Sequence, residues 1–121
     1  MFELTKEFRF DAAHTLEREI NAEGSRRIHG HSYRAQVTLR GEPDPTTGMI
    51  IDTSVLELKL EQARDALDHR FLNEINDLGP GTMENLCAYI WRTLQTDVPS
   101  LHRVAVFRDS TSDQVAYFGA N

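Results

Sequence analysis

The chain has 121 residues, a mass of 13.8 kDa and a formal net charge of −6, so we expect one domain over residues 1–121. A hydrophobic content of 40% with 26% charged residues argues against disorder, and the acidic pI near 5.3 argues against nucleic acid as the main partner. A single cysteine excludes an intramolecular disulfide. No apolar run approaches the roughly 18 residues that span a bilayer, and the acidic N-terminus lacks signal-peptide character. These features predict a cytoplasmic protein with no membrane partner.

The first 51 residues contain two segments with the period of a β-strand. Apolar and polar residues alternate over residues 2–14 and again over residues 31–40, and a period of two indicates a strand with one buried face. Two prolines and two glycines make residues 41–48 a turn. Residues 49–51 then form a short extended piece.

Two segments with helical period follow. Ser54 and Glu57 match the S-x-x-E capping box, so residues 54–68 are predicted to form a helix. Thr82 can cap a second helix. Its apolar stripe has helical spacing and includes Met83, Leu86, Cys87, Ile90, Trp91 and Leu94, which makes Cys87 a core residue rather than a nucleophile.

Residues 101–108 and 113–119 complete the set as two further strands. The order strand, strand, helix, helix, strand, strand predicts an α+β fold. We expect a four-stranded antiparallel sheet with both helices on one face. The two open edges of such a sheet are usually blocked or paired with another subunit.

The histidines are the most informative polar residues. His29 and His31 are separated by one residue, so on an extended backbone they point the same way with Cα atoms about 6.5–7 Å apart. His14 has the apolar parity of the first strand and can supply a third ligand if the first two strands pair. Three histidines leave the fourth position of a zinc ion open, which is the catalytic pattern. The alternative interpretation is a set of exposed polar residues near a loop.

Two other polar groups allow a functional and a structural interpretation. His69, beside Asp68 at the end of the first helix, could act as a general acid or in a relay, or it could be a helix C-cap. Arg26 and Arg27 could clamp a phosphate or carboxylate, or they could belong to a solvated basic loop.

Five motifs, in order along nearly the whole chain, resemble those of the 6-pyruvoyl-tetrahydropterin synthase family and its 6-carboxy-tetrahydropterin synthase branch. They are F-D-A-A-H at 10–14, I-H-G-H-S-Y at 28–33, G-M-I-I-D at 48–52, L-D-H-R-F-L-N at 67–73 and T-M-E-N-L at 82–86. The last motif lacks the proline that precedes it in the family, because Gly81 stands there.

The resemblance implies a tunnelling fold, in which sheets of several subunits close into a barrel, as a homohexamer of two trimers. It implies zinc held by His14, His29 and His31, and 7,8-dihydroneopterin triphosphate as substrate. In the queuosine branch the products are 6-carboxy-tetrahydropterin, acetaldehyde and triphosphate. Asp68 and His69 match the family's relay pair at a subunit interface. Asp52, Arg26 and Arg27 are the substrate-binding candidates outside the C-terminal region.

The chain departs from the family at the catalytic cysteine, whose position holds Ser25. A serine hydroxyl is far less acidic than a thiol and needs a dedicated base. Some relatives use a glutamate near this position to leave a hydroxymethyl group on the pterin, and Glu23 could serve in that way. An engineered Cys-to-Ser change is also compatible with the sequence.

A second departure concerns pterin recognition. The family's pterin-holding glutamate stands eight residues before a tyrosine, and counting back from Tyr117 gives Asp109, a shorter carboxylate. Thr53 replaces the aromatic residue that commonly follows Asp52.

Three hypotheses follow, besides a purely structural oligomer. The leading one is a zinc-dependent lyase of the 6-carboxy-tetrahydropterin synthase type. The second is a relative that makes 6-hydroxymethyl-dihydropterin. The third is a zinc- and pterin-binding protein without catalysis.

Overall fold

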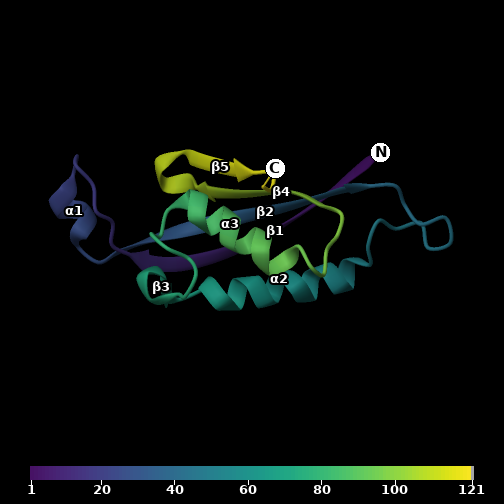
Figure 1. Ribbon diagram of the computed structural model, residues 1–121, viewed down its shortest axis with the longest axis horizontal. Helices are drawn as coiled ribbons and strands as arrows, with labels where there is room; N and C mark the ends of the chain where they lie inside the picture. Colours follow the sequence, from purple (N-terminus) through teal and green to yellow (C-terminus); the bar gives the residue numbers. More distant parts are fainter. Residues whose placement is uncertain (121) are drawn as a thin grey trace.

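The computed structural model describes residues 1–120 and has an elongated α+β architecture (Figure 1). Two single-turn 3₁₀ helices lie at Leu72–Glu74 and Asp109–Thr111. The remaining elements, in chain order, are β1 (Phe2–His14), α1 (Ala22–Arg26), β2 (His29–Gly41), α2 (Thr53–Leu67), β3 (Arg70–Phe71), α3 (Met83–Leu94), β4 (Leu101–Arg108) and β5 (Asp113–Tyr117).

One mixed sheet with the strand order β3-β1-β2-β4-β5 forms the frame of the molecule. β1 and β2 pair in antiparallel register over their whole length, from Phe2 opposite Gly41 to His14 opposite His29. The β2–β4 and β4–β5 pairs are antiparallel as well, whereas β3 runs parallel to β1. The prediction of a four-stranded antiparallel sheet is therefore wrong, because a two-residue strand carries no alternation that a sequence pattern could reveal.

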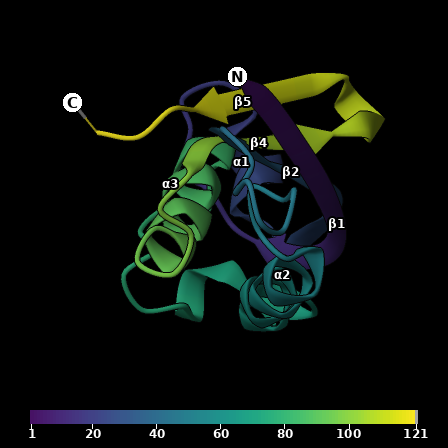
Figure 2. The same cartoon turned by 90° about the vertical axis from the view of Figure 1, so that its right-hand side faces the viewer.

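α2 and α3 cover the same face of the sheet (Figure 2). We call this the inner face and the opposite one the outer face. The period-two residues of β1, β2 and β4 meet the helices in a single core, in which Ala35, Val37, Val104 and Val106 are fully buried. Burial of this apolar surface, at about 25 cal/mol per Å², is the main stabilising term.

α1 is a third helix that the sequence did not predict, so the expectation of two helices is corrected. It is five residues long, includes Gly24 and buries only Ser25. A segment this short has no apolar period to detect. It lies beyond one end of the sheet (Figure 1).

The helix starts differ in how well they were predicted. Thr82 caps α3 as expected, since its hydroxyl accepts a hydrogen bond from the backbone N–H of Asn85 at 3.2 Å. The cap of α2 is Asp52 instead, whose carboxylate accepts from the N–H of Ser54 at 2.8 Å. The Ser54–Glu57 capping box is therefore wrong. In the expected extended piece at residues 49–51, residues 50 and 51 form a bend and residue 49 has no regular secondary structure.

Within residues 1–120, no helix combines the length and the hydropathy that crossing a membrane requires.

Candidate metal centre and active site

Three imidazoles converge where β1 ends and β2 begins. The Nε2 atom of His14 lies 3.0 Å from Nε2 of His29 and 3.1 Å from Nε2 of His31. Because His14 is paired with His29 and Ala12 with His31, the parity of the two strands places all three rings on the inner face. Nitrogens that share one tetrahedral zinc lie about 3.3 Å apart for Zn–N bonds near 2.0–2.1 Å, so the spacing fits a single ion.

In His14 and His29, the hydrogen bond of Nδ1 determines the protonation of Nε2, the nitrogen that points to the other rings. Nδ1 of His14 lies 2.8 Å from the carbonyl oxygen of Gly81, and Nδ1 of His29 lies 2.8 Å from that of Arg27. A carbonyl only accepts, so each Nδ1 is the protonated nitrogen and each Nε2 presents a lone pair. Lone pairs that face one another at 3.0 Å repel unless a cation lies between them. The donor set therefore fits a metal ion held by neutral imidazoles.

The local environment keeps the rings of His14 and His31 neutral. Burial lowers the pKa of His14, which is 1% exposed. Burial also lowers the pKa of His31, to about 4, and the nearby positive charge of Arg108 adds to this effect. Neutral imidazole is the form that binds metals.

Two glycines permit the close packing around these rings. A Cβ on Gly30, between His29 and His31, would lie 3.3 Å from the carbonyl oxygen of Ala12. A Cβ on Gly81 would lie 3.3 Å from the ring of His14 and 3.1 Å from Cβ of Leu72. The glycine that replaces the expected proline at position 81 thus lies directly against the first histidine.

Asp68 and His69 are hydrogen-bonded to β1 at Asp11. The N–H of Asp11 donates to Oδ1 of Asp68 at 2.9 Å, and the N–H of His69 donates to the carbonyl of Asp11 at 2.7 Å. The Asp11 hydrogen bond, with help from Arg64, lowers the pKa of Asp68. Nδ1 of His69 lies 3.2 Å from Oδ2 of Asp68. Aspartate therefore orients the imidazole of His69, as the relay interpretation requires.

The side chain of His69 is 82% exposed within this chain, and the backbone at this residue is left-handed with φ 58°. His69 and His31 line the same open cleft of about 530 Å³. His69 and one member of the histidine cluster, His31, are therefore neighbours along one cleft.

The candidates of α1 lie beyond the end of the sheet. Ser25 is buried, and its carbonyl accepts from the N–H of Leu16 at 2.8 Å. Glu23 forms an exposed ion pair with Arg27 at 2.8 Å, and Arg26 forms another with Glu17 at 3.1 Å. In this chain the two arginines are therefore paired with carboxylates rather than gathered into an anion clamp.

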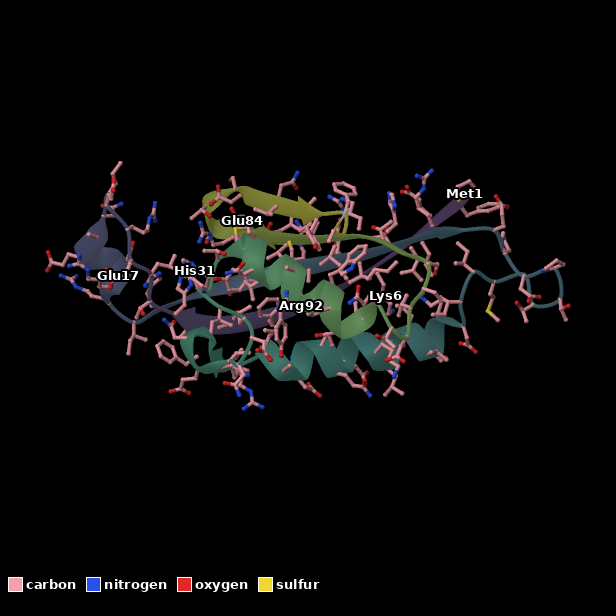
Figure 3. All side chains as sticks on the ribbon, viewed as in Figure 1. Met1, Lys6, Glu17, His31, Glu84 and Arg92 are labelled. Atoms are coloured by element: carbon pink, nitrogen blue, oxygen red, sulfur yellow. The ribbon has the colours of Figure 1, made fainter. Side chains whose placement is uncertain are left out.

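The structure does not bring Asp52 or Asp109 together with the histidines. Asp52 caps α2, and the neighbouring loop residues line a groove beside Phe2, at the opposite end of β1 from His14. Asp109 lies on the outer face, where both of its carboxylate oxygens bind the guanidinium of Arg34 at 3.1 and 3.3 Å. In Figure 3, Met1 and His31 are labelled toward opposite ends of the molecule.

Sequence reasoning missed a pocket on the inner face. A cavity of about 310 Å³ next to His14 has Arg18, Tyr33, Glu84 and Arg108 among its lining residues, and Figure 3 places Glu84 and His31 in the same part of the molecule. One signal was available, since Arg108 shares the parity of the buried residues Val104 and Val106. Glu84 lies within the T-M-E-N-L motif. Cys87 is fully buried, as predicted, and burial raises its pKa to about 11.

Comparison with known proteins identifies the family to which the chain belongs. The model of the 6-pyruvoyl tetrahydropterin synthase family matches residues 3–119. A 6-carboxy-5,6,7,8-tetrahydropterin synthase from Synechocystis is 40% identical over 93% of this chain and 90% of its own length. The human 6-pyruvoyl tetrahydrobiopterin synthase is 36% identical over 75% of this chain and 66% of its own. The solved Caenorhabditis elegans 6-pyruvoyl tetrahydropterin synthase superposes with a TM-score of 0.86 at 27% identity, over 98% of this chain and 96% of that one. The chain therefore belongs to the 6-pyruvoyl tetrahydropterin synthase family.

Proposed function

We propose that the protein is a zinc-dependent carbon–carbon lyase of the 6-carboxy-tetrahydropterin synthase type, acting on the side chain of 7,8-dihydroneopterin triphosphate. The observation that carries the proposal is the convergence of three imidazoles, with Nε2 of His29 and of His31 lying 3.0 and 3.1 Å from Nε2 of His14, in a chain 40% identical to a synthase of that kind. Zinc bound by His14, His29 and His31 would supply a Lewis acid for the oxygens of the pterin side chain.

In this proposal His69 moves the protons. The lowered pKa of Asp68 keeps that side chain an anion at neutral pH, and its Oδ2, 3.2 Å from Nδ1 of His69, orients the imidazole. His69 lines the cleft that His31 also lines, so a substrate bound in the cleft would contact both residues.

Ser25 is proposed as a weak substitute for the family's cysteine. Its hydroxyl is a much poorer acid than a thiol, so the main base is assigned to His69. Glu23 would have to leave its ion pair with Arg27 to act as a base. Arg26 and Arg27 would contact the substrate triphosphate only after exchanging their present carboxylate partners.

Two carboxylates are candidates for holding the N–H groups of the pterin ring. Asp109 has the expected spacing from Tyr117, but it lies on the outer face and would meet the ring only in a site completed by another subunit. Glu84 lies in the cavity next to His14, and that position favours Glu84. Asp52, the cap of α2, would likewise contact substrate only across a subunit boundary.

The remaining parts of the proposal concern the setting of the enzyme. We expect a cytoplasmic homohexamer in pterin or queuosine biosynthesis. The exposed side chain of His69 supports oligomerisation, because a second subunit would cover the cleft and exclude water from it.

Mass spectrometry of the products formed from 7,8-dihydroneopterin triphosphate by the zinc-loaded protein tests the proposal. We expect 6-carboxy-tetrahydropterin, with acetaldehyde and triphosphate. Formation of 6-hydroxymethyl-dihydropterin would establish the alternative cleavage, and Glu23→Gln would then abolish it. Return of unchanged substrate would contradict both.

A pterin-binding protein without catalysis is the second candidate, and the presence of Ser25 is the observation that favours it. In that case, the substrate binds without turnover and Ser25→Cys creates activity. If Ser25→Cys leaves an inactive protein inactive, loss of the thiol does not explain the missing catalysis.

A further inference from the structure

Arg108 projects into the cavity beside the histidines. β2 and β4 pair with Arg34 opposite Phe107 and Ala35 opposite Val106, so the same register places Arg108 level with Tyr33 on the inner face. Both residues line the 310 Å³ cavity together with His14. The side chain of Arg108 is 21% exposed. A guanidinium therefore lies mostly buried next to the candidate metal centre.

Two hydrogen bonds orient the guanidinium of Arg108 and leave other N–H donors of the group free. Its Nη2 donates to Oδ2 of Asp113 at 2.7 Å, and its Nε donates to the hydroxyl of Thr111 at 2.8 Å. A guanidinium has five N–H donors, and the bonds of Arg108 to Thr111 and Asp113 use one on Nε and one on Nη2. Asp113 and Thr111 thus hold the side chain in place while leaving donors for a ligand.

Tyr33 supplies a second unsatisfied group in the same wall. Its hydroxyl is the single buried side-chain N or O atom, within the described residues, that lacks a hydrogen-bond partner. The residue is only 2% exposed, with its ring stacked on Phe10 at 5.0 Å. A buried hydroxyl without a partner is unfavourable. A ligand oxygen that accepts from it would remove this penalty.

We propose that Arg108 and Tyr33 form a subsite, beside the histidine cluster, for an acidic group of the substrate. Phosphate and carboxylate oxygens share the chemistry that this subsite recognises, since both accept hydrogen bonds from a guanidinium. Arg18 adds a second positive charge at the same cavity. Glu84, an acceptor in the same cavity, suits the N–H groups of a heterocycle. The cavity therefore matches a ligand with N–H donors on one part and an acid on another.

The inference deepens the proposed function by naming the substrate group that Arg108 selects. Only the measurements with pterin probes rest on that function. Zinc-loaded protein would be titrated calorimetrically with inorganic triphosphate and, separately, with 6-carboxypterin and 6-hydroxymethylpterin. The variants are Arg108→Gln, Tyr33→Phe and the control Arg40→Gln. Arg40 is an exposed arginine paired with Glu3 at the far end of the sheet.

We expect Arg108→Gln to weaken binding of an acidic probe about 10- to 100-fold, from the loss of charged hydrogen bonds. Arg40→Gln should leave that affinity unchanged. An effect on triphosphate alone identifies a phosphate subsite, and an effect on 6-carboxypterin but not on 6-hydroxymethylpterin identifies a carboxylate subsite. Tyr33→Phe should weaken the same probe while leaving the melting temperature equal or higher, which a purely structural role would not do.

Two results would overturn the proposal. One is an unchanged affinity of Arg108→Gln for both acids, which is also the result expected if anions bind only to the zinc, because all three histidines remain. The other is the absence of binding of either acid to the wild-type protein. The outcome is separate from that of the proposed function. If 7,8-dihydroneopterin triphosphate is not converted but anion binding depends on Arg108, the lyase proposal fails and the subsite stands.

Discussion

The chemistry of each histidine depends on what its second ring nitrogen contacts. Carbonyl oxygens of Gly81 and Arg27 hold the Nδ1 protons of His14 and His29, so the Nε2 lone pairs are left to face one another. The imidazole of His69 contacts the carboxylate of Asp68 instead, which fixes the orientation of the ring. The same type of side chain is thus positioned as a candidate metal ligand in one place and as the partner of a carboxylate in another.

Replacement of His14 tests the metal centre. His14→Ala removes the buried ligand, and the loss of zinc affinity should exceed the ~10- to 100-fold typical of an outer-shell partner. Elemental analysis after dialysis measures it as metal per chain. His102→Ala is the matched control, because that ring packs against Phe118, outside the cluster. Equal zinc content in the two variants would contradict the assignment.

At the scale of elements, the ends of α2 are fixed by carboxylates that the apolar pattern does not reveal. Asp52 caps its beginning. Asp68, directly after its last turn, ties the helix to β1 and receives Nη2 of Arg64 at 3.0 Å. The helix is therefore held at both ends, and the Asp68 contact also positions His69.

The cap of α2 gives a stability prediction. Asp52→Ala should lower the free energy of unfolding by about 1 kcal/mol, since it leaves the N–H of Ser54 without its acceptor. Ser54→Ala is the control, because the capping acceptor is a carboxylate of Asp52. Urea denaturation compares the two variants. A larger loss in Ser54→Ala would restore the capping-box interpretation.

The Asp68 contact predicts how stability depends on pH. The pKa of Asp68 is lower in the folded chain than in the unfolded one. Its contribution is therefore present above the unfolded value near 3.9 and is lost as the pH falls through the folded value. Asp68→Asn should cost about 1 kcal/mol at pH 7 and progressively less below pH 4. Thermal melts at pH 7 and pH 3 measure this difference.

Asp65→Asn provides the comparison for that measurement. Asp65 is on the same helix, but its side chain is 76% exposed and its ion pair with Arg64 is long, at 3.8 Å. Its replacement should therefore change the melting temperature little at either pH. A cost of Asp68→Asn that does not vary with pH would contradict the role assigned to the carboxylate.

At the scale of the whole molecule, the sheet has two open edges, β3 and β5. The residue that follows β5, Phe118, is 60% exposed, and Ile28 beside the histidines is 72% exposed. Open edges and exposed apolar side chains suit an assembly in which neighbouring sheets continue one another.

Light scattering with size-exclusion chromatography tests the proposed hexamer. We expect a mass near six times the 13.8 kDa of the chain. Phe118→Asp should reduce that mass, because it puts a charge next to the β5 edge. Leu58→Asp, at a similarly exposed site on α2, should not. A wild-type monomer that is fully active would contradict the need for a second subunit at the cleft.

The sequence by itself determined the long elements and the three candidate metal ligands, because both depend on local periodicity. Alternation over residues 2–14 corresponds to β1, and the parity it assigns to His14 is the parity that brings this ring to His29. The apolar stripe of α3 and its Thr82 cap were visible for the same reason.

Only the tertiary structure decided the features that depend on how strands pair. The parallel contact of β3, the outward direction of Asp109 and the inward direction of Arg108 follow from registers between segments distant in sequence. A count from Tyr117 places Asp109 in the site, but a one-residue difference along a strand reverses the face. The pairing of β2 with β4 therefore places Arg108, not Asp109, beside the histidines.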